Sequence, residues 1–210
     1  MKIRLTYILP IIFALYSYGT SAQDMKRGYC VESTESYPRH LYIKTNIVNW
    51  LMAISNFSLE ADLSQHWSVT LPVSFSTWNY FSSTVKFRTL SFYPEIRYWT
   101  SEHQDGWFAG VHYGIAWYNF AIGKKYRTQD KGGHTPAIGA GVAAGYRLPI
   151  HKNNRWQLEF SLSLGIYKLH HDQFLNTHNG PRVRRERKIY FGPDQLSVSL
   201  AYMIDLKKSK

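Results

Sequence analysis

Residues 156–166 read WQLEFSLSLGI, and every second residue in this stretch is apolar. The residues between them are Gln, Glu, Ser or Gly, so an extended chain here has one apolar and one polar face. Period-two alternation predicts a β-strand that lies between two different environments. The strand is also long, since strands of soluble proteins average only about 5–6 residues.

The same alternation occurs seven more times, and no helical stripe competes with it. We therefore predict an all-β fold, an eight-stranded antiparallel up-and-down barrel over residues 41–206. Proline lacks the N–H that a sheet ladder needs, so we expect bulges at Pro72 and Pro94. The seven further stretches are residues 41–48, 57–64, 67–76, 89–98, 107–116, 138–148 and 195–205.

The connections alternate between short and long. This asymmetry is typical of a transmembrane β-barrel of the outer membrane, with short periplasmic turns, longer outer loops and periplasmic termini. Strands of this length, tilted by ~45°, rise roughly 25 Å, which matches the apolar band of such barrels. The short links are residues 65–66, 100–106 and 149–154, and the long ones are 50–55, 77–87, 121–136 and 169–193.

Tryptophans mark both ends of the predicted strands. Trp67, Trp107 and Trp156 each open a strand after a short turn, and a second group lies toward the opposite ends. Such rows are typical of the aromatic girdles at the two membrane interfaces. The second group is Trp50, Trp78 and Trp117.

Alternation alone does not say which face points outward. In a soluble ligand-binding barrel the apolar face would point inward and the second face would meet water. That second face carries Ser, hardly any Lys and many glycines, a poor soluble exterior but a suitable lining for a crowded lumen. The membrane reading is therefore favoured over a soluble periplasmic barrel. The glycines are Gly110, Gly114, Gly139, Gly141, Gly145 and Gly165.

The N-terminus predicts export from the cytoplasm. Lys2 and Arg4 precede an apolar run of about ten residues, and small residues lead to Ala22, as in a cleaved secretory signal peptide. We expect residues 1–22 to be that signal, residues 23–40 a flexible periplasmic segment and residues 207–210 a basic tail. Cys30 lacks a preceding lipobox, so we expect it to be a free thiol.

The composition restricts the function classes. The 210 residues suit one domain, and a single cysteine excludes internal disulfides and a four-thiolate zinc site. The net charge of +11 suggests nucleic acid as a partner. Removal of residues 1–22, which hold two bases and no acid, leaves +9, and an exported chain meets no nucleic acid.

The polar faces of the strands carry both acids and bases. If the apolar face meets lipid, these charges share a lumen that in an eight-stranded barrel is just wide enough for side chains. We expect them to pair and to close the lumen. The predicted lumen network is Lys44, Glu60, Asp62, Glu95, Arg97, Arg147, Glu159 and Asp205.

Two of the long loops are basic. Guanidinium groups bind phosphate well, and the outer leaflet carries anionic lipopolysaccharide. We expect a monomer at the surface of a Gram-negative outer membrane, in contact with lipid, lipopolysaccharide or a surface protein. The predicted basic patch is Lys124, Lys125, Arg127, Arg182, Arg184, Arg185, Arg187 and Lys188.

No catalytic or metal centre is predicted, and no cofactor. His170, His171 and Asp172 are adjacent, but neighbouring residues of an extended chain point to opposite sides. An enzyme acting on lipid A would need a serine beside a histidine. His112 falls near mid-lumen, and the sequence assigns no serine to it. A lipid-modifying enzyme therefore stays an alternative to the structural or surface-interaction role.

Several stretches are similar to those of a known family: KTNIVNW at 44–50, NFSLE at 56–60, PEIRYW at 94–99, FAGVH at 108–112, Tyr118, Asn119, and residues 139–147 and 156–166. On these residues the sequence resembles domain-of-unknown-function family 3575 of Bacteroidota. The resemblance spans residues 41–206 and implies a small secreted or outer-membrane barrel with no established activity. Some relatives accompany fimbrial surface proteins, which implies a surface or adhesion role. The chain departs from outer-membrane barrels in general by ending in LKKSK instead of an aromatic residue.

Overall fold

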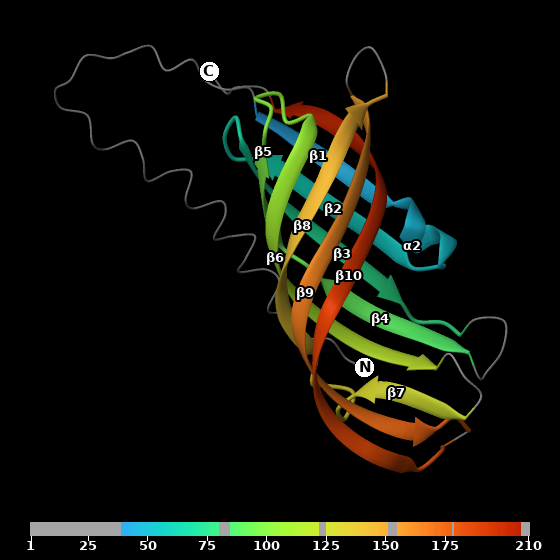
Figure 1. Cartoon of the computed structure of the whole chain (residues 1–210). Coiled ribbons are helices and arrows are strands. Elements are labelled where there is room, and N and C mark those ends of the chain that lie inside the picture. The colour runs from blue at the N-terminus through green and yellow to red at the C-terminus, as the bar shows by residue number, and fades with distance from the viewer. Residues whose placement is uncertain (1–38, 80–84, 122–124, 151–154, 178, 207–210) are drawn as a thin grey trace, which may run out of the picture. The chain divides into compact units, whose positions relative to one another are not determined.

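The computed structural model describes residues 39–79, 85–121, 125–150, 155–177 and 179–206 (Figure 1). The predicted signal peptide, most of the segment 23–40 and the tail 207–210 lie outside these residues. No helix in the described ranges is long and apolar enough to cross a membrane. The elements are β1 (Arg39–Asn46), α2 (Ile47–Leu51), β2 (Ser55–Asp62), β3 (Trp67–Ser76), β4 (Lys86–Phe92), β5 (Glu95–Trp99), β6 (Gly106–Ala121), β7 (Tyr126–Asp130), β8 (Ala137–Pro149), β9 (Trp156–Leu175) and β10 (Arg182–Leu206).

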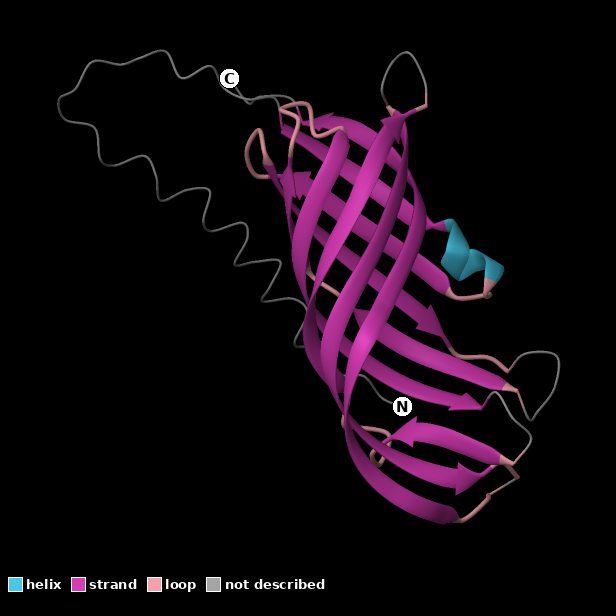
Figure 2. Ribbon diagram, in the orientation of Figure 1, coloured by secondary structure: helices cyan, strands magenta, loops and turns pink. Residues whose placement is uncertain are grey.

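The strands form a ring of eight, and all neighbours in it are antiparallel. Strand β1 pairs with β2 on one side and with β10 on the other, which closes the ring. Ile43 shows the closure, since it lies opposite both Leu59 and Tyr202. Strands β4 and β5 together occupy one place, between β3 and β6. The predicted all-β class is thus confirmed, as the magenta strands of Figure 2 show.

Apolar side chains lie mainly on the outside of the ring. Val111, Val142 and Ile166 are each more than half exposed. In contrast, Glu60, Arg147 and Glu159 have at most 1% of their surface exposed. The alternation along each strand therefore separates an apolar exterior from a polar interior.

The predicted bulges at Pro72 and Pro94 are wrong. Pro94 separates β4 from β5, but the register with β3 and β6 is the same on both sides of the gap. The two prolines keep carbonyl contacts, since Tyr93 N donates to Pro72 O and Tyr113 N donates to Pro94 O. Losing an N–H interrupts the ladder without inserting a residue. The register shifts between β9 and β10 lie elsewhere, between Arg182 and Arg184 and between Pro193 and Gln195.

The predicted loops at 121–136 and 169–193 are largely strands. β6 continues to Ala121, β9 to Leu175 and β10 starts at Arg182, and β7 pairs with β6 and β9. We call residues 168–175 of β9, residues 182–189 of β10 and all of β7 the strand extension. Its strands have polar residues on both faces, so period-two apolar alternation did not reveal them.

The first predicted strand also ends early, because its last two residues begin a helix. Asn46 is extended and its side chain accepts a hydrogen bond from Val48 N, which caps α2. A side-chain acceptor at this position satisfies one of the free N–H groups of a first helical turn. The short helix α2 thus connects β1 to β2 at the end of the ring opposite the short turns (Figure 1).

Candidate functional site

Six charged side chains from five strands meet inside the ring. Two carboxylates, Glu60 on β2 and Glu159 on β9, lie at the centre. Both are fully screened from water by the groups around them. Three acids face three bases, so the group is formally neutral. We call Lys44, Glu60, Glu95, Arg97, Arg147 and Glu159 the charged cluster.

Each central carboxylate contacts the same three cations. Lys44 Nζ lies 2.5 Å from Glu60 Oε2 and 3.2 Å from Glu159 Oε1. Arg97 Nη1 lies 3.2 and 2.8 Å from those two oxygens. Arg147 Nη2 lies 2.7 Å from Glu60 Oε2 and 2.6 Å from Glu159 Oε2. Such charge-assisted hydrogen bonds are roughly twice as strong as neutral ones.

Aromatic rings pack against the cations of the charged cluster. The Arg147 guanidinium lies 4.2 Å from the centre of the Trp99 ring and 4.6 Å from that of Tyr42. Arg97 lies 4.3 Å from the Phe108 ring. Ring faces attract cations, most strongly where water is excluded. Trp99 was not among the predicted interior residues, although it follows Arg97 by two residues and therefore shares its face.

Glu95 joins the cluster through Arg97, whose Nε lies 2.8 Å from Glu95 Oε1. The room for this side chain comes from Gly110 on the neighbouring strand. A Cβ at residue 110 would lie 2.5 Å from Glu95 Oε1. This explains one of the interior glycines in physical terms.

Two predicted members of the lumen network lie apart from the cluster. Asp62 is buried, but it accepts hydrogen bonds from His40 N at 3.1 Å and contacts His40 Nδ1 at 2.8 Å. The Asp205 side chain is 57% exposed and reaches His40 at 3.6 Å and Arg155 at 3.8 Å. Its assignment to the network is wrong, because it lies one residue from the end of β10, at the rim of the ring.

A second polar group surrounds Asp194, a residue outside the predicted lumen network. Ser163 Oγ donates to Asp194 Oδ1 at 2.5 Å, and Tyr167 OH donates to Oδ2 at 2.6 Å. His112 Nε2 lies 2.7 Å from Oδ2. We call these four residues the Asp194 cluster. Tyr93 packs its ring against those of His112 and Tyr167.

The register shift in β10 explains why Asp194 faces inward. Regular alternation would place Gln195 inside and Asp194 outside. The irregularity between Pro193 and Gln195 lets two consecutive side chains face the interior. Bulges re-aim side chains in this way. Pro193 was the available signal in the sequence, since proline is common at bulges.

The Asp194 cluster brings a serine near His112, which the sequence could not do. However, Ser163 donates its hydroxyl to the carboxylate of Asp194. A nucleophilic serine instead needs a hydrogen bond to its base. Among the described residues no hydrogen bond joins Ser163 to His112. The geometry thus gives no support to the alternative of a lipid-modifying enzyme.

Within the part of the chain that the structure describes, no group of three or more His, Cys, Asp or Glu side chains could hold a metal ion. His171 Nε2 lies 3.3 Å from Glu186 Oε2, and Asp172 is engaged by Arg185.

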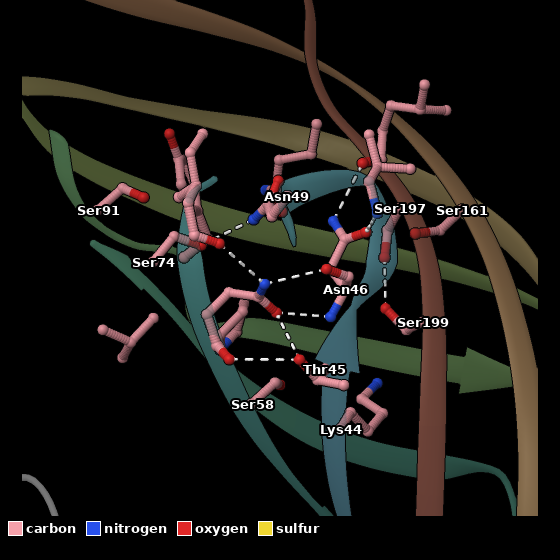
Figure 3. Close-up of a pocket in the computed structure, with 18 of the residues that line it drawn as sticks. Lys44, Thr45, Asn46, Asn49, Ser58, Ser74, Ser91, Ser161, Ser197 and Ser199 are labelled. Atoms are coloured by element: carbon pink, nitrogen blue, oxygen red, sulfur yellow. Dashed lines mark hydrogen bonds between the residues drawn. The ribbon is translucent and has the colours of Figure 1, made fainter. Parts of the chain in front are cut away.

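A cavity of about 400 Å³ lies inside the ring, on the α2 side of the charged cluster (Figure 3). Lys44, Arg97 and Glu159 of the cluster form part of its wall, and Asp194 forms another part. Most of the remaining wall consists of hydroxyl and carboxamide side chains. They include Thr45, Asn46, Asn49, Asn56, Ser58, Thr70, Ser74, Thr89, Ser91, Ser161, Ser163, Gln195, Ser197 and Ser199.

Six of the eight residues of the predicted basic patch lie on strands and not in loops. Lys124 is outside the described residues, Lys125 precedes β7, Arg127 lies in β7, and the other five lie in β10. Arg185 holds Asp172 with two bonds, at 2.7 and 3.1 Å. This contact lowers the pKa of Asp172. Arg184 pairs with Glu186. Among the described residues, the exposed members of the patch that form no ion pair with an acid are Lys125, Arg187 and Lys188.

The predicted girdle tryptophans sort into two levels. Trp67, Trp107 and Trp156 are 46%, 63% and 44% exposed and lie at the end with the short turns. Each forms an edge contact with a tyrosine of the adjacent strand, at centroid distances of 5.2, 5.0 and 4.9 Å. Those partners are Tyr98, Tyr146 and Tyr202. Trp50 and Trp78 are exposed and Trp117 half-buried toward the α2 end.

Of the comparisons with known proteins, only the one with family models gives a match. A family model described as "Protein of unknown function (DUF3575)" matches residues 27–204, which is most of the chain. No curated protein and no solved structure gives a significant match.

Proposed function

We propose that this chain, which belongs to the family of unknown function DUF3575, is a β-barrel of the bacterial outer membrane with a closed lumen. Its role is structural or in surface interaction. The observation that carries the proposal is the inverted polarity of the ring, apolar outside and charged inside. A soluble protein that exposed so much contiguous apolar surface would associate or aggregate.

The apolar exterior is continuous around the ring. Every strand of the ring contributes to it, and the exposed residues recur at alternate positions, as expected of a surface that faces lipid. They include Ile43 on β1, Phe57 and Leu59 on β2, Val73 and Phe75 on β3, Ile96 on β5, Val111 and Tyr113 on β6, Ile138 and Val142 on β8, Phe160, Leu162, Leu164 and Ile166 on β9, and Leu196 on β10.

The tryptophans support a membrane position with the short turns in the periplasm. The three exposed Trp–Tyr pairs lie at one end of the apolar band, and Trp50 and Trp78 lie toward the other. Amphipathic rings are favoured at the boundary between hydrocarbon and water. The strand extension then projects from the outer face. Residues 1–22 would serve as the cleaved signal peptide that export requires.

The charged cluster supports a closed lumen. Its side chains and the packed rings of Tyr42 and Trp99 are nearly or fully buried, so they fill the ring at their level. An ion crossing there would have to break contacts that hold both central carboxylates. The cluster therefore acts as a plug that also fixes the register of five strands.

The strand extension is the part available for partners at the surface. Its basic residues suit phosphate groups of lipopolysaccharide, because guanidinium groups bind phosphate with two parallel hydrogen bonds. Since Asp172 and Glu186 engage Arg184 and Arg185, we expect Arg187 and Lys188 to carry most of this contact. A fimbrial or other surface protein is the second candidate partner for the strand extension.

The test is membrane fractionation followed by electrophoresis without and with heating. A folded barrel remains in the outer-membrane fraction after a carbonate wash and migrates faster unheated than heated. The wild type in planar bilayers gives no steady conductance. Release into the soluble periplasmic fraction would contradict the membrane proposal, and steady single-channel currents would contradict the plug.

A further inference from the structure

The cavity beside the charged cluster has no role in the plug, and its wall is chemically distinctive. Figure 3 shows Asn49 beside Ser74 and Ser197 beside Ser199, on opposite sides of the space. A volume of about 400 Å³ falls within the ~300–1,000 Å³ that small-molecule sites occupy. The cavity is therefore large enough for one small ligand.

The charges in the wall favour a ligand without net charge. Lys44, Arg97 and Glu159 already satisfy one another within the charged cluster. Asp194 is held by three donors, from His112, Ser163 and Tyr167. No cation of the wall remains free for an anion, and desolvating an unpaired charge would be costly.

Three groups on the β9 and β10 side remain free to bind. The Nε2 atom of Gln195 is buried and has no hydrogen-bond partner among the described residues. The hydroxyl of Ser161 engages no other described side chain or backbone group. Asp194 Oδ1 accepts one hydrogen bond, from Ser163, and a carboxylate oxygen can accept two. The donor and the acceptor thus lie on consecutive residues, and the hydroxyl lies on β9, opposite Ser197.

This arrangement suits adjacent hydroxyl groups, since each hydroxyl can donate one hydrogen bond and accept another. The rings of Phe87 and Tyr93 line the same cavity from the β4 side. They offer apolar surface to the C–H faces of a sugar ring, through dispersion contacts. The opposite side is held in place by Asn56, whose side chain donates to Asn46 O at 2.9 Å and accepts from Asn46 N at 2.5 Å.

We infer that the cavity is a binding site for a small neutral saccharide. Gln195, Ser161 and Asp194 Oδ1 bind its hydroxyl groups, and Phe87 and Tyr93 contact its apolar face. The site lies on the α2 side of the plug and is reached from there. The inference does not depend on the membrane proposal, because the residues of the cavity wall are the same whether or not the outside of the ring meets lipid.

The experiment titrates the refolded full chain in detergent micelles with neutral mono- and disaccharides, using calorimetry. Matched titrations use glucose 6-phosphate and a polysaccharide released from lipopolysaccharide by mild acid. At least one neutral sugar binds with a dissociation constant in the millimolar range or tighter, and its phosphorylated form binds at least tenfold more weakly. Binding of the released polysaccharide in addition to a free neutral sugar would identify a surface glycan as the source.

The double variant Gln195→Leu, Ser161→Ala raises the dissociation constant about tenfold, since two hydrogen bonds to the ligand are lost. The matched control is Gln65→Leu, Ser64→Ala, the same two substitutions in the exposed turn after β2, which leaves the constant unchanged. Ser161→Phe fills the cavity and abolishes binding. Circular dichroism verifies that each variant retains its strands.

Three results would overturn the inference. They are no heat of binding from any neutral sugar to the folded wild type, tighter binding of the phosphorylated sugar, and equal effects of the two double variants. Each is independent of fractionation and heat-modifiable migration, so failure of the sugar site and failure of the membrane proposal are distinguishable.

Discussion

Glu60 on β2 and Glu159 on β9 are joined by the same guanidinium nitrogen, Arg147 Nη2, at 2.7 and 2.6 Å. The two carboxylates would repel each other strongly in a dry interior, and they tolerate this proximity because Lys44 and Arg97 also contact both. Removing any one cation leaves negative charge without compensation. The first prediction concerns this dependence.

Arg97→Ala lowers the free energy of unfolding by about 3–5 kcal/mol, because breaking a buried ion-pair group leaves unpaired charge. Urea unfolding of the refolded protein in micelles or vesicles measures the loss. Arg39→Ala is the control, since Arg39 is exposed at the start of β1, and it changes stability by less than ~0.5 kcal/mol. Equal stability of the two variants would refute the structural role of the cluster. Arg97→Ala also creates no conductance.

Gly110→Ala destabilises the fold by about 1–3 kcal/mol, as overpacking does, because the new Cβ would lie 2.5 Å from Glu95 Oε1. In the background Glu95→Ala the same substitution costs much less. A double-mutant cycle from urea unfolding measures this coupling. If Gly110→Ala costs the same in both backgrounds, the glycine does not make room for Glu95.

Asp194→Asn destabilises the fold by about 1–3 kcal/mol, since the carboxamide leaves at least one of the donors Ser163, Tyr167 and His112 without its acceptor. Asp205→Asn is the matched control, and its side chain is 57% exposed. It changes stability by less than ~0.5 kcal/mol. Should the two variants be equally stable, Asp194 is not an interior residue.

The strand extension loosens at low pH. Arg185 holds the pKa of Asp172 below its ordinary value, so the carboxylate stabilises the fold above its unfolded pKa, ~3.9. That contribution falls as the pH drops through the lower pKa of the folded state. Amide hydrogen exchange of β9 and β10, corrected for its intrinsic pH dependence, therefore accelerates at Asp172 and its neighbours below about pH 4.

Arg185→Gln is the control for this pH effect. It makes exchange in the strand extension faster at neutral pH and removes most of the additional acceleration in acid. An identical acid profile in the wild type and Arg185→Gln would show that Asp172 is not the titrating group.

The ring of eight strands could be predicted from the sequence because one face of each strand has to meet a different environment. Residues 156–166 carry that contrast at every position, and their predicted start and alternation agree with β9. The pattern fades where both faces meet water. Strand β7 and the outer half of β10, with Arg182 and Glu186, therefore read as loops.

The interior was predictable only as far as alternation is regular. Lys44, Glu60 and Arg147 follow it and lie in the charged cluster. Asp194 does not, because a register shift turned it inward. Asp205 follows the alternation but lies at the rim, since a side-chain period says nothing about depth along the ring. Which charges pair depends on the stagger between strands, and the sequence of a single strand does not reveal that stagger.

The central claim, that the apolar face meets lipid, is tested most directly at two neighbouring residues whose side chains point in opposite directions. In a Cys30→Ser background, a nitroxide label is placed at Leu162→Cys, which is outward and 52% exposed, or at Ser161→Cys, which lines the cavity. The refolded protein in phospholipid vesicles is then exposed to oxygen, which concentrates in lipid, or to a water-soluble nickel chelate. We predict that the label at residue 162 collides preferentially with oxygen and that the label at 161 does not. Preferential collision of the label at residue 162 with the nickel chelate would contradict the account.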